Sequence, residues 1–348
     1  MCKEQPPICA PWQDNRTIIV TTRLSLFLAL LLAVTSGAIA EQLDQKDLDK
    51  LEAMTFAAYK TNYTGVFIYQ YGNHVETSRI THISDRDGEH GRLEGLDGVN
   101  REIIHNNNQV WSYLNGHQVS VEERRGRRSF PALLPEQISV LNESYQIKKA
   151  EAERVAGLPT DVFVFQPKDK SRYSHKLWAH NDSGLLLKAA VLDDRGRIIE
   201  QYTFTHLTIG GNIDRKWITP NKPNNSSVNY HTHHPYSAPT PKTEQAVHNS
   251  GWQIGLLPPG FKKTMEVRRP LHGNKTPVTH LIFSDGLAGV SVFIEDMTGE
   301  TKVITGLSSQ GLLNIYRKIS GSNLVTVVGE VPPRTVMQIA DSARYLGH

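Results

Sequence analysis

Residues 185–209 read LLLKAAVLDDRGRIIEQYTFTHLTI: two apolar and β-branched runs flank the turn sequence DDRG at 193–196. This arrangement is typical of two antiparallel strands joined by a tight turn. Similar short runs fill the chain upstream to Asn62, separated by turn signals such as DRDG (85–88), LNG (114–116) and NDSG (181–184). The pattern predicts a meander of eight or more strands that forms a highly curved antiparallel sheet.

One helix is predicted ahead of this sheet and a shorter one within it. In residues 43–60, LDQKDLDKLEAMTFAAYK, apolar side chains recur at helical spacing, with Leu48, Leu51, Met54 and Ala58 on one face. The segment LLPEQISVLN at 133–142 predicts the second helix. The fold class is therefore α+β.

The chain changes character between residues 219 and 248, where prolines, asparagines, serines and histidines replace apolar residues. Such a composition is typical of a linker. Beyond it, HLIFSDG, GVSVFIED, LLNIYRKI and LVTVVGE predict strands, and PPRTVMQIADSARYL predicts a terminal helix. We therefore expect a first domain over 41–218, a flexible linker over 219–248 and a smaller domain over 249–348.

The N-terminus predicts export. The eleven-residue apolar run LSLFLALLLAV (24–34) follows Arg23 and precedes Ala38 and Ala40, the small residues of a signal-peptidase site, so cleavage is predicted after Ala40. A retained membrane anchor is the alternative. The long stretch before the apolar run suggests a translation start placed too early. Both cysteines lie in that stretch, so disulfides and thiol chemistry are excluded from the mature chain. The predicted location is the bacterial periplasm.

Composition and motifs argue against an enzyme and against a nucleic-acid-binding protein. The 348 residues carry 38 lysines and arginines against 35 aspartates and glutamates, a net charge of +3 that gives no general attraction to nucleic-acid phosphates. Walker-type loops, G-x-G-x-x-G, H-E-x-x-H and G-x-S-x-G are absent from the sequence. We therefore predict no catalytic residue and no cofactor.

Two polar clusters have competing interpretations. His231, His233 and His234 could capture a metal ion, but linker composition explains them more simply, and we predict no metal site. Four arginines on a glycine-containing stretch could grip phosphate or carboxylate groups, and the alternative is a solvated hairpin tip. These are Arg124, Arg125, Arg127 and Arg128.

Consecutive apolar positions such as 185–192 and 163–165 indicate that both faces of the predicted sheet are covered. A curved sheet closed by helices is a natural container for acyl chains or an apolar peptide. An ordinary core explains the same residues, and composition does not decide between them.

Several long segments in a fixed order characterise the mature sequence, among them YTGVFIYQ (63–70), RLEGLDG (92–98), FPALLP (130–135), RVAGLP (154–159), RYSHKLW (172–178), GLLLKAAVLDDRGRIIEQYTFT (184–205), WQIGLLPPGF (252–261), HLIFSDGLAGVSVFIE (280–295) and VTVVGEVPP (325–333). Through these segments the chain resembles the RseB/MucB family of periplasmic sigma-E regulators along almost the whole mature sequence. The histidine-bearing linker and the arginine stretch depart from the family pattern.

The resemblance implies a first domain similar to the lipoprotein carriers LolA and LolB, a half-open antiparallel β-barrel with a helical plug, followed by a smaller mixed α/β domain. It further implies a non-catalytic regulator that binds the periplasmic region of a membrane-anchored anti-sigma factor and shields it from proteolysis. Lipopolysaccharide or another acylated envelope component would release that hold. The alternative is a periplasmic lipid or lipoprotein carrier, and self-association into a homo-oligomer stays open.

These implied ligands suggest two sets of site residues. Acyl chains are expected against Phe67, Trp111, Trp178, Leu185 and Leu187, with the four arginines at 124–128 near the lipid phosphates. The anti-sigma segment is expected on three apolar anchors of the second domain, Trp252, Leu257 and Phe261, whose alternative role is core packing.

Overall fold

The computed structural model describes residues 43–123, 129–219, 245–246, 249–270, 276–297 and 303–347. The predicted signal peptide, most of the predicted linker and the four arginines at 124–128 lie outside these ranges. No helix in the described ranges is long and apolar enough to cross a membrane.

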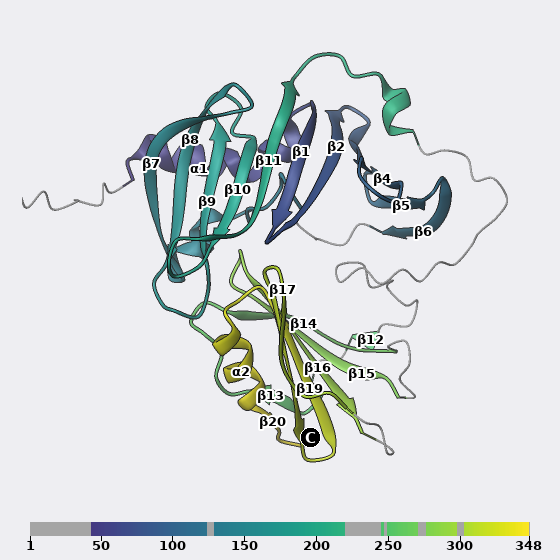
Figure 1. The fold of residues 1–348 in the computed structure, drawn as a ribbon, viewed down its shortest axis with the longest axis vertical. Coiled ribbons are helices and arrows are strands. Elements are labelled where there is room, and N and C mark those ends of the chain that lie inside the picture. The colour runs from purple at the N-terminus through teal and green to yellow at the C-terminus, as the bar shows by residue number, and fades with distance from the viewer. Residues whose placement is uncertain are drawn as a thin grey trace, which may run out of the picture. The chain divides into compact units, whose positions relative to one another are not determined.

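The larger of the two main sheets has eleven strands, all paired antiparallel, in the order β6-β5-β4-β3-β2-β1-β11-β10-β9-β8-β7 (Figure 1). Because β6 and β7 are its two edges, the sheet stays open, which confirms the expected half-open architecture. Its strands are β1 Tyr63–Tyr71, β2 His74–Asp85, β3 Gly88–Gly95, β4 Arg101–Asn106, β5 Gln109–Leu114, β6 His117–Glu123, β7 Tyr145–Val155, β8 Leu158–Pro167, β9 Ser174–His180, β10 Leu186–Leu192 and β11 Ile198–Ile209.

Helix α1, Gln45–Lys60, confirms the predicted leading helix. The Asp44 carboxylate caps its N-terminus by accepting a hydrogen bond from the Asp47 amide at 2.8 Å. Leu51, Met54 and Ala58 of the predicted apolar face are buried, whereas Leu48 is 39% exposed. The buried face of the helix is therefore rotated away from Leu48 and includes Asp47 and Thr55, which the sequence had not indicated.

The main core lies between α1 and the strands β7 to β11 and β1. Phe130 and the short 3-10 helix η1, Ile138–Glu143, complete this core, and η1 occupies the place of the second predicted helix. The fully enclosed residues of this main core include Leu51, Leu141, Phe163, Phe165, Leu185 and Leu187. A second 3-10 helix, η2 Arg215–Ile218, follows β11 and contacts β2, β3 and β4.

The smaller main sheet has seven strands in the order β12-β14-β15-β16-β19-β18-β17, again antiparallel. They are β12 Gln245–Ala246, β14 Lys262–Arg269, β15 Val278–Ser284, β16 Gly289–Asp296, β17 Gly306–Gln310, β18 Leu313–Ser320 and β19 Asn323–Gly329. Helix α2, Pro333–Asp341, contacts β17, β18 and β19. The predicted terminal helix is shorter than expected, because the chain turns at Ser342 and β20 (Ala343–Tyr345) pairs with β13 (Trp252–Ile254).

Candidate binding surfaces

Phe130 covers the aromatic part of the larger sheet. Its ring centroid lies 5.2 Å from that of Phe67 on β1, and 5.2 Å and 5.1 Å from those of Tyr202 and Phe204 on β11. The Tyr202 ring is stacked parallel to it. Phe130 is itself only 5% exposed, so an acyl chain could reach this aromatic group only after Phe130 had moved.

Most of the apolar residues expected to bind lipid are enclosed. Phe67, Leu185 and Leu187 lie in the main core, and Trp178 is 3% exposed. The Trp178 indole N–H donates to the Glu153 carboxylate at 2.9 Å, and the ammonium groups of Lys176 and Lys188 lie over its ring. Trp111 on β5 is half-buried and lies outside the main core cluster. The structure thus brings four of the five, Trp178 included, into one core where they already contact protein.

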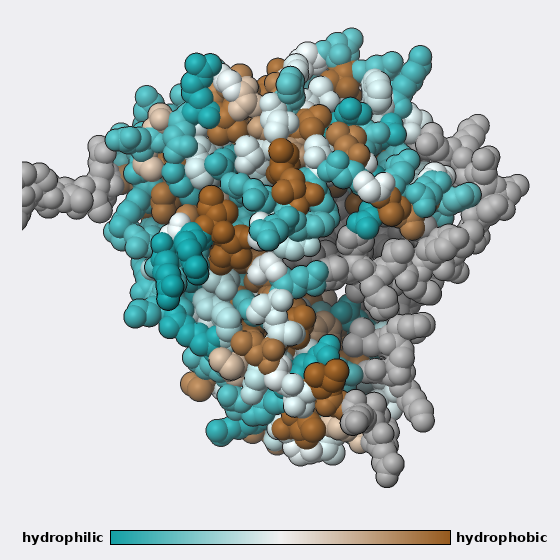
Figure 2. Space-filling model, viewed as in Figure 1, coloured by the Kyte–Doolittle hydropathy of each residue, from teal (hydrophilic) through white to brown (hydrophobic). Residues whose placement is uncertain are grey.

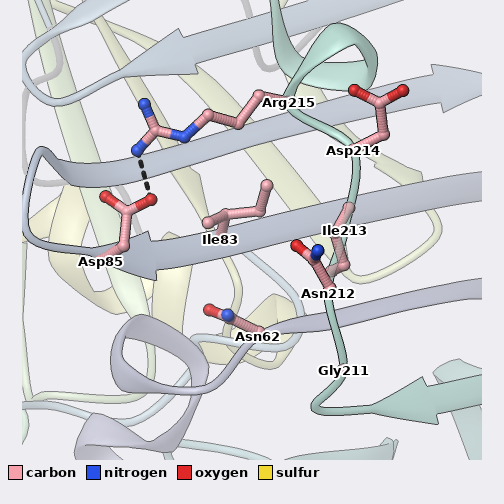
Figure 3. A pocket seen from close by; sticks show the side chains of 8 residues that line it. All are labelled: Asn62, Ile83, Asp85, Gly211, Asn212, Ile213, Asp214 and Arg215. Atoms are coloured by element: carbon pink, nitrogen blue, oxygen red, sulfur yellow. Dashed lines mark hydrogen bonds and ion pairs between the residues drawn. The ribbon is translucent and has the colours of Figure 1, made fainter.

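A polar pocket of about 540 Å³ lies where the chain leaves β11 and crosses β2 (Figure 3). Arg215 spans it and pairs with Asp85 and, at 2.7 Å, with Asp87. The hydrogen bond from Arg215 holds the pKa of the Asp85 carboxyl below its ordinary value. This lining suits a small polar ligand better than an acyl chain, and the sequence marked Asp85 and Asp87 only as part of the DRDG turn.

A second pocket, of about 300 Å³, lies between α1 and strands β8 and β9. Met54, Phe163 and Ala179 form its apolar wall, and Lys50 and Asp161 make an ion pair at its rim. This pocket therefore joins the surface to the main core and offers a small apolar recess.

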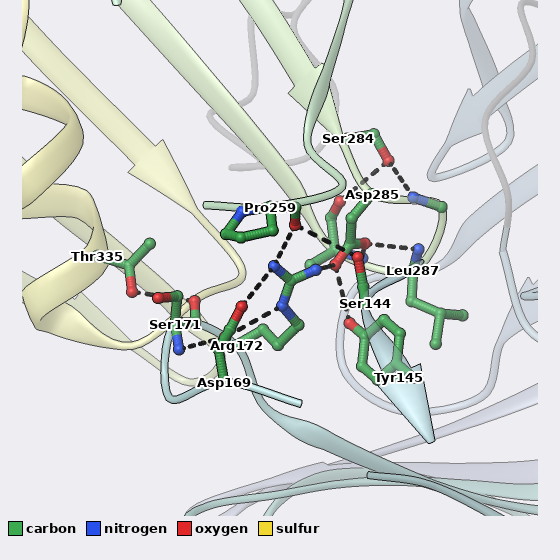
Figure 4. Close-up of polar contacts among 12 residues, drawn as sticks. Ser144, Tyr145, Asp169, Ser171, Arg172, Pro259, Ser284, Asp285, Leu287 and Thr335 are labelled. Atoms are coloured by element: carbon green, nitrogen blue, oxygen red, sulfur yellow. Dashed lines mark hydrogen bonds and ion pairs between the residues drawn. The ribbon is translucent and has the colours of Figure 1, made fainter. Parts of the chain in front are cut away.

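The ordered contacts between the two main sheets centre on Arg172, which lies in the loop between β8 and β9 (Figure 4). Its guanidinium donates to the Asp285 carboxylate at 2.6 Å, to Asp169 at 2.9 Å and to the Pro259 carbonyl oxygen at 2.5 Å. The side chains of Arg172 and Asp285 are both fully buried. A buried ion pair of this kind requires good geometry and several hydrogen bonds to offset desolvation, and Arg172 has both.

Further contacts surround this ion pair. The Tyr145 hydroxyl donates to Asp285 at 3.0 Å, and burial raises the pKa of that phenol well above its ordinary value. The Thr335 hydroxyl donates to the Ser171 carbonyl oxygen at 2.9 Å. Gly260 has a positive φ, and a Cβ on it would lie 2.0 Å from the Ser144 hydroxyl oxygen, so the chain needs glycine there.

The three residues expected to anchor a partner have different environments. Phe261 is 7% exposed and its ring lies 5.1 Å from the Arg172 guanidinium, so it belongs to the core and to the contact between the sheets. Trp252 and Leu257 are half-buried, and the Trp252 ring packs beside Tyr345. Figure 2 shows apolar residues scattered among hydrophilic ones on the face drawn, without one broad apolar patch.

An open antiparallel sheet with a packed helix, linked by buried polar contacts to a smaller sheet, defines a two-part α+β protein. The chain belongs to the MucB/RseB family. The model of the MucB/RseB N-terminal domain matches residues 46–222, and that of the C-terminal domain matches residues 246–344. This family consists of regulatory proteins and not of enzymes.

Curated relatives and solved structures agree with this assignment. The sigma factor AlgU regulatory protein MucB of Pseudomonas aeruginosa is 30% identical over 331 residues, which cover 93% of this chain and 97% of that protein. The sigma-E factor regulatory protein RseB of Haemophilus influenzae is 27% identical, with 91% and 96% covered. The solved MucA/MucB complex of P. aeruginosa matches with a TM-score of 0.66 at 27% identity, covering 86% of this chain and 99% of the solved chain.

Proposed function

We propose that this chain is a periplasmic regulator that binds the periplasmic region of a membrane-anchored anti-sigma factor and restrains a sigma-E-type envelope-stress response. The observation that carries this proposal is the match of both sheets, over nearly the whole described chain, to MucB, which has been solved in complex with MucA. The N-terminal segment directs export, and cleavage follows Ala40.

In this proposal the bound anti-sigma segment is hidden from the protease that would cut it first. The segment docks on the second domain beside Trp252 on β13 and Leu257 in the loop after it, which both retain exposed surface. Phe261 supports this surface from beneath, because its ring is enclosed against Arg172. An extended or helical segment with apolar anchors fits such a site.

Acylated envelope components, lipopolysaccharide foremost, release the anti-sigma segment. The four arginines at 124–128 directly precede Ser129 and Phe130 in the sequence, so lipid phosphates held there would bring acyl chains next to Phe130. An acyl chain that displaced Phe130 would reach Phe67 and the β11 aromatics. If the lipid binds the peptide-free form more tightly, it lowers peptide occupancy by the same coupling factor.

A protease-protection assay tests the anti-sigma part of the proposal. The tethered periplasmic region of the partner is digested with and without the full chain, and we expect protection that saturates with added protein. Trp252→Ala together with Leu257→Ala should weaken protection, whereas Ile319→Ala, which alters an exposed apolar residue on β18 of the seven-stranded sheet, should not. No protection in any condition would favour the lipid or lipoprotein carrier, which would instead transfer acyl ligands to an acceptor.

The release step has its own test. Replacing Arg124, Arg125, Arg127 and Arg128 by alanine should raise the lipopolysaccharide concentration needed to end protection and leave protection without lipid intact. An unchanged dose response would remove this arginine cluster from the mechanism.

A further inference from the structure

One residue from each of strands β1 to β4 lies in a single row across the larger sheet. Tyr63 pairs with His82, His82 with Gly91, and Gly91 with His105, so all four point to the same face of the sheet. Gly91 has no side chain, and a Cβ there would lie 2.2 Å from the His105 ring. The glycine therefore makes the space in which the rings of His82 and His105 approach each other across an intervening strand, with centroids 6.2 Å apart.

Glu89 joins the two histidines. It lies two residues before Gly91 on β3 and therefore on the same face. Its carboxylate oxygen Oε1 is 3.2 Å from Nε2 of His82 and 3.5 Å from Nε2 of His105. The three atoms all lie within 4.8 Å of one another.

A hydrogen bond and a stacking contact fix the orientation of the His82 ring. Its Nδ1 lies 2.8 Å from the carbonyl oxygen of Thr61, the residue that caps α1, and its ring is stacked on Tyr63. A carbonyl oxygen can only accept, so Nδ1 carries a proton and donates it. In the neutral ring the lone pair is then on Nε2, which faces Glu89. Metal-binding histidines are held in this way, with the second ring nitrogen donating to a carbonyl or carboxylate.

The close approach of His82 Nε2 to the Glu89 carboxylate is favourable only when a positive charge lies between the two atoms. A lone pair on His82 Nε2 and a carboxylate oxygen repel each other at 3.2 Å unless a proton or a metal ion lies between them. With tetrahedral zinc at about 2.0 to 2.1 Å from each ligand, neighbouring ligand atoms are about 3.3 Å apart. The two distances to Glu89 match that separation. The Nε2 atoms of both histidines thus converge on the same oxygen of Glu89.

We propose that His82, Glu89 and His105 form a binding site for a divalent transition-metal ion, Zn²⁺ foremost, in the larger sheet. Two imidazoles and one carboxylate suit this ion, and a water molecule would complete the tetrahedron. Glu89 and His105 are 23% and 22% exposed, which leaves an entry path. The bound ion would tie β2, β3 and β4 to one another and, through His82, to the end of α1.

The test uses the full exported chain, stripped of metal with a chelator and titrated with ZnCl₂ in a calorimeter. The background variant carries His231→Ala, His233→Ala and His234→Ala, so that the linker histidines contribute nothing. We expect one zinc ion per chain, a higher melting temperature with zinc, and binding at least about ten-fold weaker in Glu89→Gln and in His105→Gln. His82 stays unchanged because it is buried. His90→Gln is the matched control, since His90 lies next to Glu89 on the opposite face.

Cobalt provides a readout that does not depend on variants. Co²⁺ added to the stripped background chain should give the strong visible absorption of a tetrahedral site, and added zinc should remove it. Loss of zinc binding when the linker histidines alone are replaced would overturn the proposal. So would zinc affinity that is unchanged in Glu89→Gln and His105→Gln, with circular dichroism confirming that both variants fold.

Discussion

The two halves of the larger sheet are stabilised differently, as one row of paired residues illustrates. Phe204 on β11 pairs with Phe67 on β1, which pairs with Ser78 on β2, which in turn pairs with Gly95 on β3. Within four strands the row passes from an enclosed aromatic cluster to small residues. The half with β7 to β11 and β1 depends on apolar burial and enclosed polar contacts. The half with β2 to β6 encloses few apolar side chains, among them Ile83, Ile104 and Tyr113, and depends more on partly exposed ion pairs.

Arg92 illustrates the second half. Its guanidinium pairs with Glu94 at 3.0 Å and with Glu102 at 2.9 Å, and all three side chains keep between 12% and 19% of their surface exposed. Such contacts are weaker than enclosed ones and respond to salt. Changes in salt and other solution conditions should therefore affect mainly the stability of strands β2 to β6. Packing defects should affect mainly the stability of β7 to β11 and β1.

The largest effect is expected where the apolar half meets the second sheet. Arg172→Met removes the partner of the buried Asp285 carboxylate, and an uncompensated buried charge costs about 4 kcal/mol. Urea unfolding should show this loss. Arg197→Met, which breaks an ion pair of a 71% exposed arginine, is the control and should leave the curve unchanged. Equal stability of Arg172→Met and wild type would mean that the enclosed polar contacts do not hold this region together.

The second-largest effect is expected from a cavity created in the aromatic cluster around Phe130. Phe204→Ala should lower the free energy of unfolding by about 3 kcal/mol, because Phe204 is 1% exposed and contacts Phe67 and Phe130. Ser78→Ala, in the same row, should change it by no more than about 0.5 kcal/mol. Comparable losses in the two variants would abolish the distinction between the halves.

A smaller effect is expected from His175 when the pH falls. Burial lowers the pKa of His175 to about 4, against a partial opposing effect of the Asp285 carboxylate, whereas in the unfolded chain it is near 6.5. Between these values only the unfolded chain takes up the proton, so stability is lost as the pH falls from about 6.5 to 4. Since His175 as a whole residue is only half-buried, we expect a loss of about 2 kcal/mol.

The check is urea unfolding of wild type and His175→Gln at two pH values on either side of this window. The variant should lack this part of the acid-induced loss, and His74→Gln, at an exposed position, should retain it. The same acid sensitivity in His175→Gln and wild type would assign the effect to other groups.

The sequence predicted the strands and α1 well, because alternation, turn residues and helical spacing are local signals. It did not reveal that Phe67, Leu185 and Leu187 lie in a filled core, since a core and a lipid cavity require the same apolar pattern. Arg172 was also missed as a polar anchor: a single loop arginine is unremarkable until Asp285, more than a hundred residues later, is placed beside it.

The cluster of His82, Glu89 and His105 escaped prediction from the sequence for a different reason. His82 and His105 are 23 positions apart and match no metal-binding spacing, so the sequence alone does not single them out. Strand register brings them together, and Gly91 makes the contact possible. The signal that could have found them is the histidine–glycine–histidine row, which becomes visible only once β2, β3 and β4 have been paired.

The smallest effect is expected in strands β2 to β6, where Arg92 forms its two ion pairs. Arg92→Gln should lower the free energy of unfolding by about 1 kcal/mol, because the two ion pairs are only partly shielded from water. Unlike the loss in Phe204→Ala, this loss should shrink when salt is raised toward 1 M, where the Debye length falls to about 3 Å. Unfolding curves of both variants at low and high salt make the comparison. A loss in Arg92→Gln that does not depend on salt would mean that the guanidinium stabilises β2 to β4 by packing rather than by charge.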